Sequence, residues 1–202
     1  MKIQIASRTS PLALLQTNQV ISKMQLLNPD CECSIVEIRS EGDLTDKPLH
    51  LIGGKGLFVS KLEAALSEGI ADFAVHSLKD VPALLDTQFA IAATMPREEV
   101  GDALLLREGL SIDDLSGSLK IATSGPRRKS QLLSLNSKLS IIPIRGNIQT
   151  RINKMTSENL DGLIVAKAAL NRLNIMHSNI YLFSEEQMLP AASQGAIGIE
   201  IH

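Results

Sequence analysis

Hydrophobic positions in this chain fall into short runs that are followed by polar loops and then by helical spacing. Alternation around Ile3 and Ile5 predicts a first strand, and the apolar run at 73–75 predicts a buried one. Further strands are predicted over 34–38, 89–93, 102–106, 119–122, 141–144, 163–165 and 197–201. Repeated strand–loop–helix units of this kind are typical of an α/β fold with a parallel sheet.

Two helix boundaries are marked by their residues. Ser10 followed by Pro11 predicts a helix start, because a hydroxyl caps the first turn and proline suits the first helical position. A second amphipathic helix is predicted from Phe58 to a glycine C-cap at Gly69. Arg8 lies just before the first helix, where free backbone donors already favour an anion.

The segment between the buried strand and Pro82 carries the densest set of reactive groups, His76, Ser77, Lys79 and Asp80. Pro82 cannot continue a strand ladder, and the ends of parallel strands are where open α/β sheets bind ligands. A lysine there can hold an anionic substrate group, while a carboxylate can stabilise a developing cation or move a proton. The alternative is a polar turn with a surface ion pair.

Arginines recur in the loops after three later strands, beside glycine or hydroxyl residues. The loops contain Thr123, Ser124, Arg127 and Arg128 after the first strand, Arg145 and Arg151 after the second, and Arg172 after the third. One such arginine is most simply a solvated charge. Several at the ligand edge of one sheet predict a polyanionic ligand, with carboxylates or phosphates, because guanidinium groups pair with these groups bidentately.

The segment 53–58 has three glycines in four residues and includes Lys55. Glycine lets a ligand approach the backbone closely, but the spacing is not that of a phosphate-binding P-loop. The segment is interpreted either as a mobile binding loop or as an ordinary turn in which glycine is common.

Composition narrows the class of protein. A chain of 202 residues has room for one or two domains. A net charge of −2 and 2% aromatic residues do not favour nucleic-acid binding. The sequence has no signal-peptide pattern and no run of about 18 apolar residues, so a cytoplasmic protein without a membrane span is expected.

The two cysteines, Cys31 and Cys33, are predicted to point to opposite faces of a strand. Their spacing suits neither a disulfide framework nor a zinc site. Reduced thiols and no bound metal are expected.

At this point six motifs resemble those of the porphobilinogen deaminases, also called hydroxymethylbilane synthases. They are Ser7–Ala13, Gly53–Phe58, His76–Pro82, Thr123–Ser124 with Arg127–Arg128, Arg145–Asn147 with Thr150–Arg151, and Gln194–Ala196 with Gly198–Glu200. The motifs occur in the order found in that family and span nearly the whole chain.

The resemblance implies two α/β domains like those of type II periplasmic solute-binding proteins, flanking a cleft. Domain 1 is expected over 1–98 plus 195–202, and domain 2 over 99–194. The family has a third, smaller domain whose cysteine anchors a dipyrromethane cofactor through a thioether. The chain is expected to lack that domain, and Cys31 and Cys33 match no cofactor motif, so no covalent dipyrromethane is expected.

The activity implied by the resemblance is that of a transferase of haem biosynthesis. It condenses four porphobilinogen molecules head to tail into a linear tetrapyrrole and releases ammonia. Asp80 would be the catalytic acid beside the pyrrole nitrogens, and Phe58 would cover the substrate ring. The groups expected to bind substrate and cofactor are Arg8, Ser10, Lys55, Ser77, Lys79, Thr123, Ser124, Arg127, Arg128, Arg145, Arg151, Arg172 and Gln194. A monomer is expected.

Some residues depart from the family pattern. Ala122, Gly125–Pro126, Ala169 and Ser193 stand where the family usually has glycine or serine. The alternative hypothesis is therefore a truncated or degenerate homologue that binds a polycarboxylate without turnover.

Overall fold

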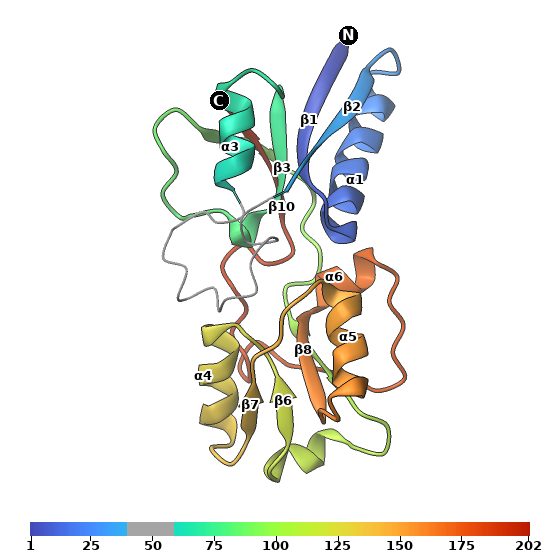
Figure 1. Cartoon of the computed structure of the whole chain (residues 1–202), viewed down its shortest axis with the longest axis vertical. Coiled ribbons are helices and arrows are strands. Elements are labelled where there is room, and N and C mark those ends of the chain that lie inside the picture. Colours follow the sequence, from blue (N-terminus) through green and yellow to red (C-terminus); the bar gives the residue numbers. More distant parts are fainter. Residues whose placement is uncertain (40–58) are drawn as a thin grey trace. The chain divides into compact units, whose positions relative to one another are not determined.

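The computed structural model describes residues 1–39 and 59–202. The chain divides into two compact units, Met1–Glu98 with Gly195–His202 (unit 1) and Glu99–Gln194 (unit 2). Within the described residues, each unit contains a five-stranded sheet with helices packed on it (Figure 1).

Unit 1 has the strand order β2-β1-β3-β10-β4. Its described elements are β1 (Lys2–Arg8), α1 (Pro11–Leu27), β2 (Glu32–Ile38), α3 (Ser60–Ser67), β3 (Phe73–Ser77), the 3-10 turn η2 (Leu78–Asp80), β4 (Ala90–Thr94) and β10 (Ile197–Ile201). Strand β1 is parallel to β2 and β3, whereas β10 is antiparallel to β3 and β4. Helices α1 and α3 cover opposite faces of the sheet (Figure 1).

Unit 2 repeats this layout in the order β7-β6-β8-β5-β9. Its elements are β5 (Asp102–Leu106), η3 (Ile112–Ser116), β6 (Lys120–Ala122), α4 (Pro126–Leu135), β7 (Ser140–Ile142), α5 (Ile148–Ser157), β8 (Gly162–Ala166), α6 (Lys167–Arg172) and β9 (Ile180–Leu182). Strand β6 is parallel to β7 and β8, whereas β5 is antiparallel to β8 and β9.

The expectation of a parallel sheet is correct for four of the five described strands of each unit and wrong for one, β10 in unit 1 and β5 in unit 2. Strands β5 and β10 enter their sheets directly after the chain crosses from one unit to the other. Neither is preceded by the helical crossover that makes successive strands parallel, so both run antiparallel. Strand β9 and the turn η3 were not predicted from the sequence.

The local signals at the helix ends are confirmed where the structure describes them. The Ser10 hydroxyl accepts a hydrogen bond from the Ala13 amide at 3.3 Å, and Pro11 opens α1. Helix α3 ends just before Gly69, which has a φ of +67°. This left-handed conformation is one that glycine adopts without a Cβ penalty.

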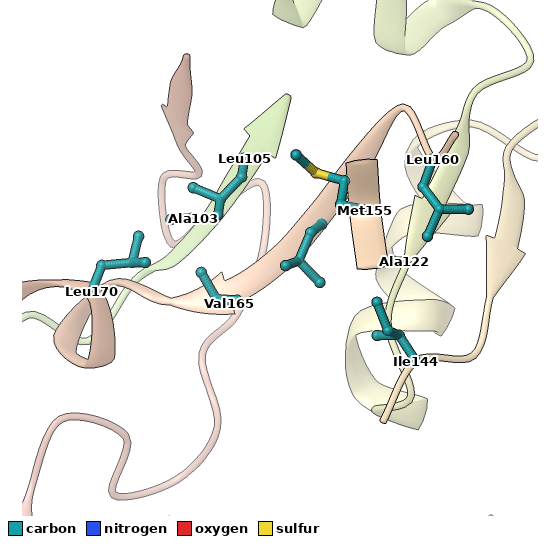
Figure 2. Packing of buried hydrophobic residues seen from close by; sticks show 9 residues of the cluster. Ala103, Leu105, Ala122, Ile144, Met155, Leu160, Val165 and Leu170 are labelled. Atoms are coloured by element: carbon teal, nitrogen blue, oxygen red, sulfur yellow. The ribbon is translucent and has the colours of Figure 1, made fainter. Parts of the chain in front are cut away.

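The core of unit 2 lies on both faces of its sheet. Ala103 and Leu105 face α5 and α6, with Met155 and Leu170 among their neighbours, and Figure 2 shows this cluster. The alternate β5 residues, including Leu104, join the cluster on the α4 side. A strand buried on both faces gives the continuous apolar run seen in the sequence.

The cysteine prediction was wrong in its geometry. Cys31 and Cys33 both pack into the cluster on the α1 side of unit 1, with their Sγ atoms 3.6 Å apart. Residues two apart on a strand point to the same face, which is why these side chains meet. Burial, a contact with Cys31 and its charge raise the pKa of the Cys33 thiol. Both thiols are free.

Among the described helices, none has the length and apolar character that a bilayer crossing requires.

Candidate active site

In unit 1 the predicted site residues gather where β1 and β3 end. These strands are parallel and adjacent, so Arg8 at the end of β1 and Ser77 at the end of β3 lie at one edge of the sheet. The turn η2 follows at once and carries Lys79 and Asp80. Asp80 is exposed, while Lys79 is half-buried. The exposed carboxylate is therefore available to a ligand at this edge.

Buried polar groups from α1 support the same edge. Gln16 Nε2 donates to the Ser77 hydroxyl at 2.9 Å, and the Thr17 hydroxyl donates to that of Ser7 at 2.8 Å. Gln16 and Thr17 are buried although they lie on a helix that packs on the sheet. Sequence reasoning missed both; two adjacent polar residues inside the helix were the available signal. Gln16 holds the Ser77 side chain and Thr17 holds that of Ser7 before any ligand arrives.

The sequence suggested that His76 is part of the loop. In the structure it lies within β3 and is buried. Its Nε2 is 2.8 Å from a carboxylate oxygen of Glu200 on β10, also buried. The atoms are in ion-pair range without the alignment of a hydrogen bond, and no hydrogen-bond partner to either Glu200 oxygen exists among the described residues. Burial, and next the charge of Glu200, raise the pKa of the nearby Glu63.

In unit 2 the hydroxyl loop after β6 is tied to the loop after β7. The Ser124 hydroxyl donates to the Ile144 carbonyl at 2.6 Å and accepts from the Ile144 amide at 2.9 Å. Thr123 is buried next to it. These bonds hold the two loops in one arrangement at the carboxyl edge of the sheet.

Arg127 and Arg128, in the first turn of α4, share one buried carboxylate, that of Asp102. Arg127 Nη2 donates to Asp102 Oδ2 at 2.7 Å, and Arg128 donates to Oδ1 from Nε at 3.2 Å and from Nη2 at 2.7 Å. Burial acts to raise the pKa of Asp102. The charge and hydrogen bonds of Arg128, together with the hydrogen bonds of Arg127 and Gln194, outweigh burial and lower that pKa. Asp102 was not predicted as a site residue. The only signal in the sequence was a charged residue at the first position of an apolar strand.

Gln194 is fully buried. Its Nε2 donates to the Val100 carbonyl at 2.6 Å and to Asp102 Oδ1 at 3.0 Å. The amide therefore contacts the carboxylate that holds the arginines.

The remaining predicted arginines of unit 2, Arg145, Arg151 and Arg172, are half-buried. Arg151 Nε donates to the Gly146 carbonyl at 2.7 Å, within the turn before α5. Arg145 lies in the loop that leads to this turn, and Arg172 is the last residue of α6. The glycine-rich segment 53–58, with Lys55 and Phe58, lies outside the described residues.

These side chains suit a ligand with carboxylate groups and ring N–H donors. Guanidinium groups match carboxylates in geometry and charge, and the Asp80 carboxylate can accept from a pyrrole N–H. Cys31 directly precedes β2 and Cys33 is its second residue, so both lie at the amino edge of the parallel strands, opposite the carboxyl edge where Asp80 follows β3. In the part of the chain that the structure describes, no cluster of three or more metal-ligating side chains exists.

The fold defines a class, an α/β protein of the type II solute-binding architecture. A solved structure with this fold is the probable amino-acid ABC transporter extracellular-binding protein of Bacillus subtilis. It aligns with a TM-score of 0.53 and 10% identity, covering 100% of this chain and 84% of that chain.

The chain belongs to the porphobilinogen deaminase family, since residues 3–202 match its family description, "Porphobilinogen deaminase, dipyromethane cofactor binding domain". It is 47% identical over 204 residues to a porphobilinogen deaminase of Clostridium botulinum, covering 100% of this chain and 69% of that protein. It is 42% identical over 201 residues to the one of Laribacter hongkongensis, covering 99% of this chain and 65% of that protein. Porphobilinogen deaminases are transferases that use a dipyrromethane cofactor.

Proposed function

We propose that this chain provides the catalytic carboxylate and the pyrrole-binding groups of a hydroxymethylbilane synthase. The reaction condenses four porphobilinogen molecules into a linear tetrapyrrole and releases ammonia. The observation that carries the assignment is the position of Asp80, exposed on η2 directly after β3 in a chain of this family.

The arginines of unit 2 bind the acetate and propionate groups of the pyrroles. Arg127 and Arg128 stand at the start of α4, where the free amides of the first turn add to the attraction for an anion. Their side chains are 28% and 12% exposed, so each is largely shielded from water. A carboxylate that reaches them forms charge-assisted hydrogen bonds, which are shorter and stronger than neutral ones.

The dipyrromethane, when bound, supplies the pyrrole ring to which the next substrate is joined. In this chain the groups that would hold its carboxylates are Arg127, Arg128, Arg145 and Arg151, with Ser124 beside them.

Asp80 performs the electrostatic part of the reaction. When ammonia leaves the aminomethyl group of porphobilinogen, a positive charge spreads onto the substrate ring and its nitrogen. A carboxylate at hydrogen-bond distance from that N–H stabilises the charge more in the transition state than in the ground state. Lys79, next to it, is placed to hold a substrate carboxylate.

The test is Asp80→Asn, which keeps the shape of the side chain and removes its charge. Ammonia release is expected to fall about a hundredfold, while the affinity for porphobilinogen changes little. Asp86→Asn, an exposed carboxylate in the same segment, is the matched control and should keep normal turnover. Ammonia release and pyrrole binding are measured on the same preparations.

Two results would contradict the proposal in different ways. Undiminished ammonia release in Asp80→Asn would make Asp80 a loop residue without a catalytic role. Binding of porphobilinogen without any ammonia release by the unaltered protein would favour a homologue that holds polycarboxylates without turnover. The proposal also includes a cytoplasmic monomer that binds no nucleic acid, in keeping with the net charge of −2. Light scattering tests the monomer.

A further inference from the structure

Asp102 is the first residue of β5 and pairs with Ala166, the last residue of β8. It therefore lies at the carboxyl edge of unit 2, where the loops after β6 and β7 also begin. Its side chain is 0% exposed, so it cannot itself receive a ligand from solvent. A fully buried carboxylate at a ligand edge acts through the groups that it touches.

The bonds to Asp102 fix the planes of two guanidinium groups. Arg128 donates to it from Nε and Nη2 and gives an Nη1 hydrogen to the Ile164 carbonyl. Arg127 donates one Nη2 hydrogen to it and one Nη1 hydrogen to the Leu189 carbonyl. A guanidinium has five N–H groups in a rigid fork, so these bonds leave two on Arg128 and three on Arg127 for other partners, in fixed directions.

Asp102 is itself held from a distant part of the chain. Gln194 Nε2 bonds both to its carboxylate and to the Val100 carbonyl, so the amide joins the two segments on which the chain enters and leaves unit 2. The same amide nitrogen lies 3.4 Å from the Gly101 carbonyl. Gln194 can thus orient the carboxylate without adding charge.

We propose that Asp102 and Gln194 are positioning residues for carboxylate recognition. Asp102 cancels one of two positive charges and aligns Arg127 and Arg128, and Gln194 aligns Asp102. This inference rests on the proposed function, because it assigns the two arginines to pyrrole carboxylates. Aligned guanidinium groups bind a carboxylate without first losing side-chain rotamer freedom, which is how preorganisation raises affinity.

The charge of Asp102 and its alignment of the arginines have opposite effects on affinity, so the direction of the change in Kd tests the proposal. Asp102 repels an incoming carboxylate, so a carboxylate whose only effect was its charge would weaken binding, and its removal would tighten it. Loss of alignment acts the other way. The direction of the change in affinity distinguishes the two.

Asp161 provides a matched control in the same unit. It accepts from Arg107 Nη2 at 2.9 Å and from the Lys120 amide at 2.9 Å. It precedes the first residue of β8, so it lies at the amino edge, away from the predicted ligand groups. Asp161→Asn thus removes an Asp–Arg pair of unit 2 without touching Arg127 or Arg128.

The experiment measures the Kd for porphobilinogen by calorimetry in the unaltered protein, Asp102→Asn, Gln194→Met and Asp161→Asn. We expect Asp102→Asn to raise the Kd about tenfold and Gln194→Met about threefold, with little change in Asp161→Asn. In an Arg127→Ala background the effect of Asp102→Asn should be smaller, because only Arg128 is then left for Asp102 to align. Tighter binding in Asp102→Asn, or an undiminished effect in that background, would overturn the proposal.

A second measurement does not depend on pyrrole binding or on activity. The side-chain Nε–H of Arg128 donates to Asp102, so its signal in a nitrogen-correlated NMR spectrum should be sharp and slowly exchanging in the unaltered protein and in Asp161→Asn. It should exchange fast in Asp102→Asn. Retained slow exchange there would show that Asp102 does not hold Arg128, even if porphobilinogen failed to bind and the proposed function itself were wrong. Gln194→Met covers the case in which Asp102→Asn does not fold.

Discussion

At the residue scale, unit 1 contains a buried pair whose partners depend on each other. His76 and Glu200 are 2.8 Å apart, and their side chains are 4% and 0% exposed. Removing one partner of a buried ion pair leaves an uncompensated polar group, which costs about 3–5 kcal/mol, whereas replacing both by apolar groups is often neutral. A change at one of the two positions is therefore expected to be tolerated only if the other position changes with it.

We therefore expect Glu200→Leu alone to lower the free energy of unfolding by about 3 kcal/mol, and His76→Leu alone by a similar amount. The double change should cost much less than the sum, because neither partner is then left unpaired. Urea unfolding of the three variants measures this. Additive losses would mean that the two side chains are held independently by their surroundings.

The sequence allowed charged residues to be predicted as candidates for the site, but not the partners that those residues have in the structure. Arg127 and Arg128 were placed at the ligand edge because they follow a strand. Their bonds to Asp102 join positions 25 and 26 residues apart and depend on how strands pair. His76 was assigned to the loop because polarity argues for exposure, and only the pairing of β3 with β10 brings Glu200 to it. Spacing along a chain carries no information on such contacts.

At the element scale, Ser10 combines two roles that can be separated. Its hydroxyl caps α1, and the same residue is proposed to bind a ligand carboxylate beside Arg8. Ser10→Ala should lower stability by about 1 kcal/mol, because the cap is lost. Ser10→Asp should keep the cap and the stability, since aspartate is an equally good N-cap residue.

Ser10→Asp should be the more stable of the two variants but should bind porphobilinogen more weakly. Aspartate adds a negative charge next to a site for anions, so Ser10→Asp should raise the Kd for porphobilinogen more than Ser10→Ala does. Thermal melts and calorimetry on the two proteins check both halves. Equal affinities in the two variants would place Ser10 outside the binding site.

Elements were predictable where one local rule decided them. Proline after serine marked the start of α1. Strands β5 and β8 are buried on both faces, so each was visible in the sequence as a continuous apolar run. Strand β9 has three residues with Leu182 exposed, too short for a period to show. The direction of β5 and β10 was unpredictable because it is set by the crossings between units.

At the scale of the whole molecule, unit 1 depends on residues from the end of the described chain. Strand β10 lies between β3 and β4, and in the described residues β4 pairs with no other strand. Every strand of the unit 2 sheet, in contrast, comes from residues 99–194. The two units therefore differ in how they respond to loss of the last eight residues.

Deleting residues 195–202 should unfold the sheet of unit 1 and leave that of unit 2 intact. Hydrogen exchange is the measurement: amides of β3 and β4 should exchange fast, while those of β6 and β8 stay protected. Removing His202 alone keeps β10 whole and is the control. Slow exchange of β4 amides in the deletion variant would contradict the dependence on β10.

The position of β10 also fixes an order of events during synthesis. The ribosome delivers about 5–20 residues each second, and domains generally fold in the order in which they emerge. Here the unit that is begun first waits for Ile197–Ile201, whereas unit 2 has emerged in full by Gln194. The polypeptide that will carry Asp80 thus spends several seconds with the edges of β3 and β4 exposed, and it is during that interval that the nascent chain most needs protection from aggregation.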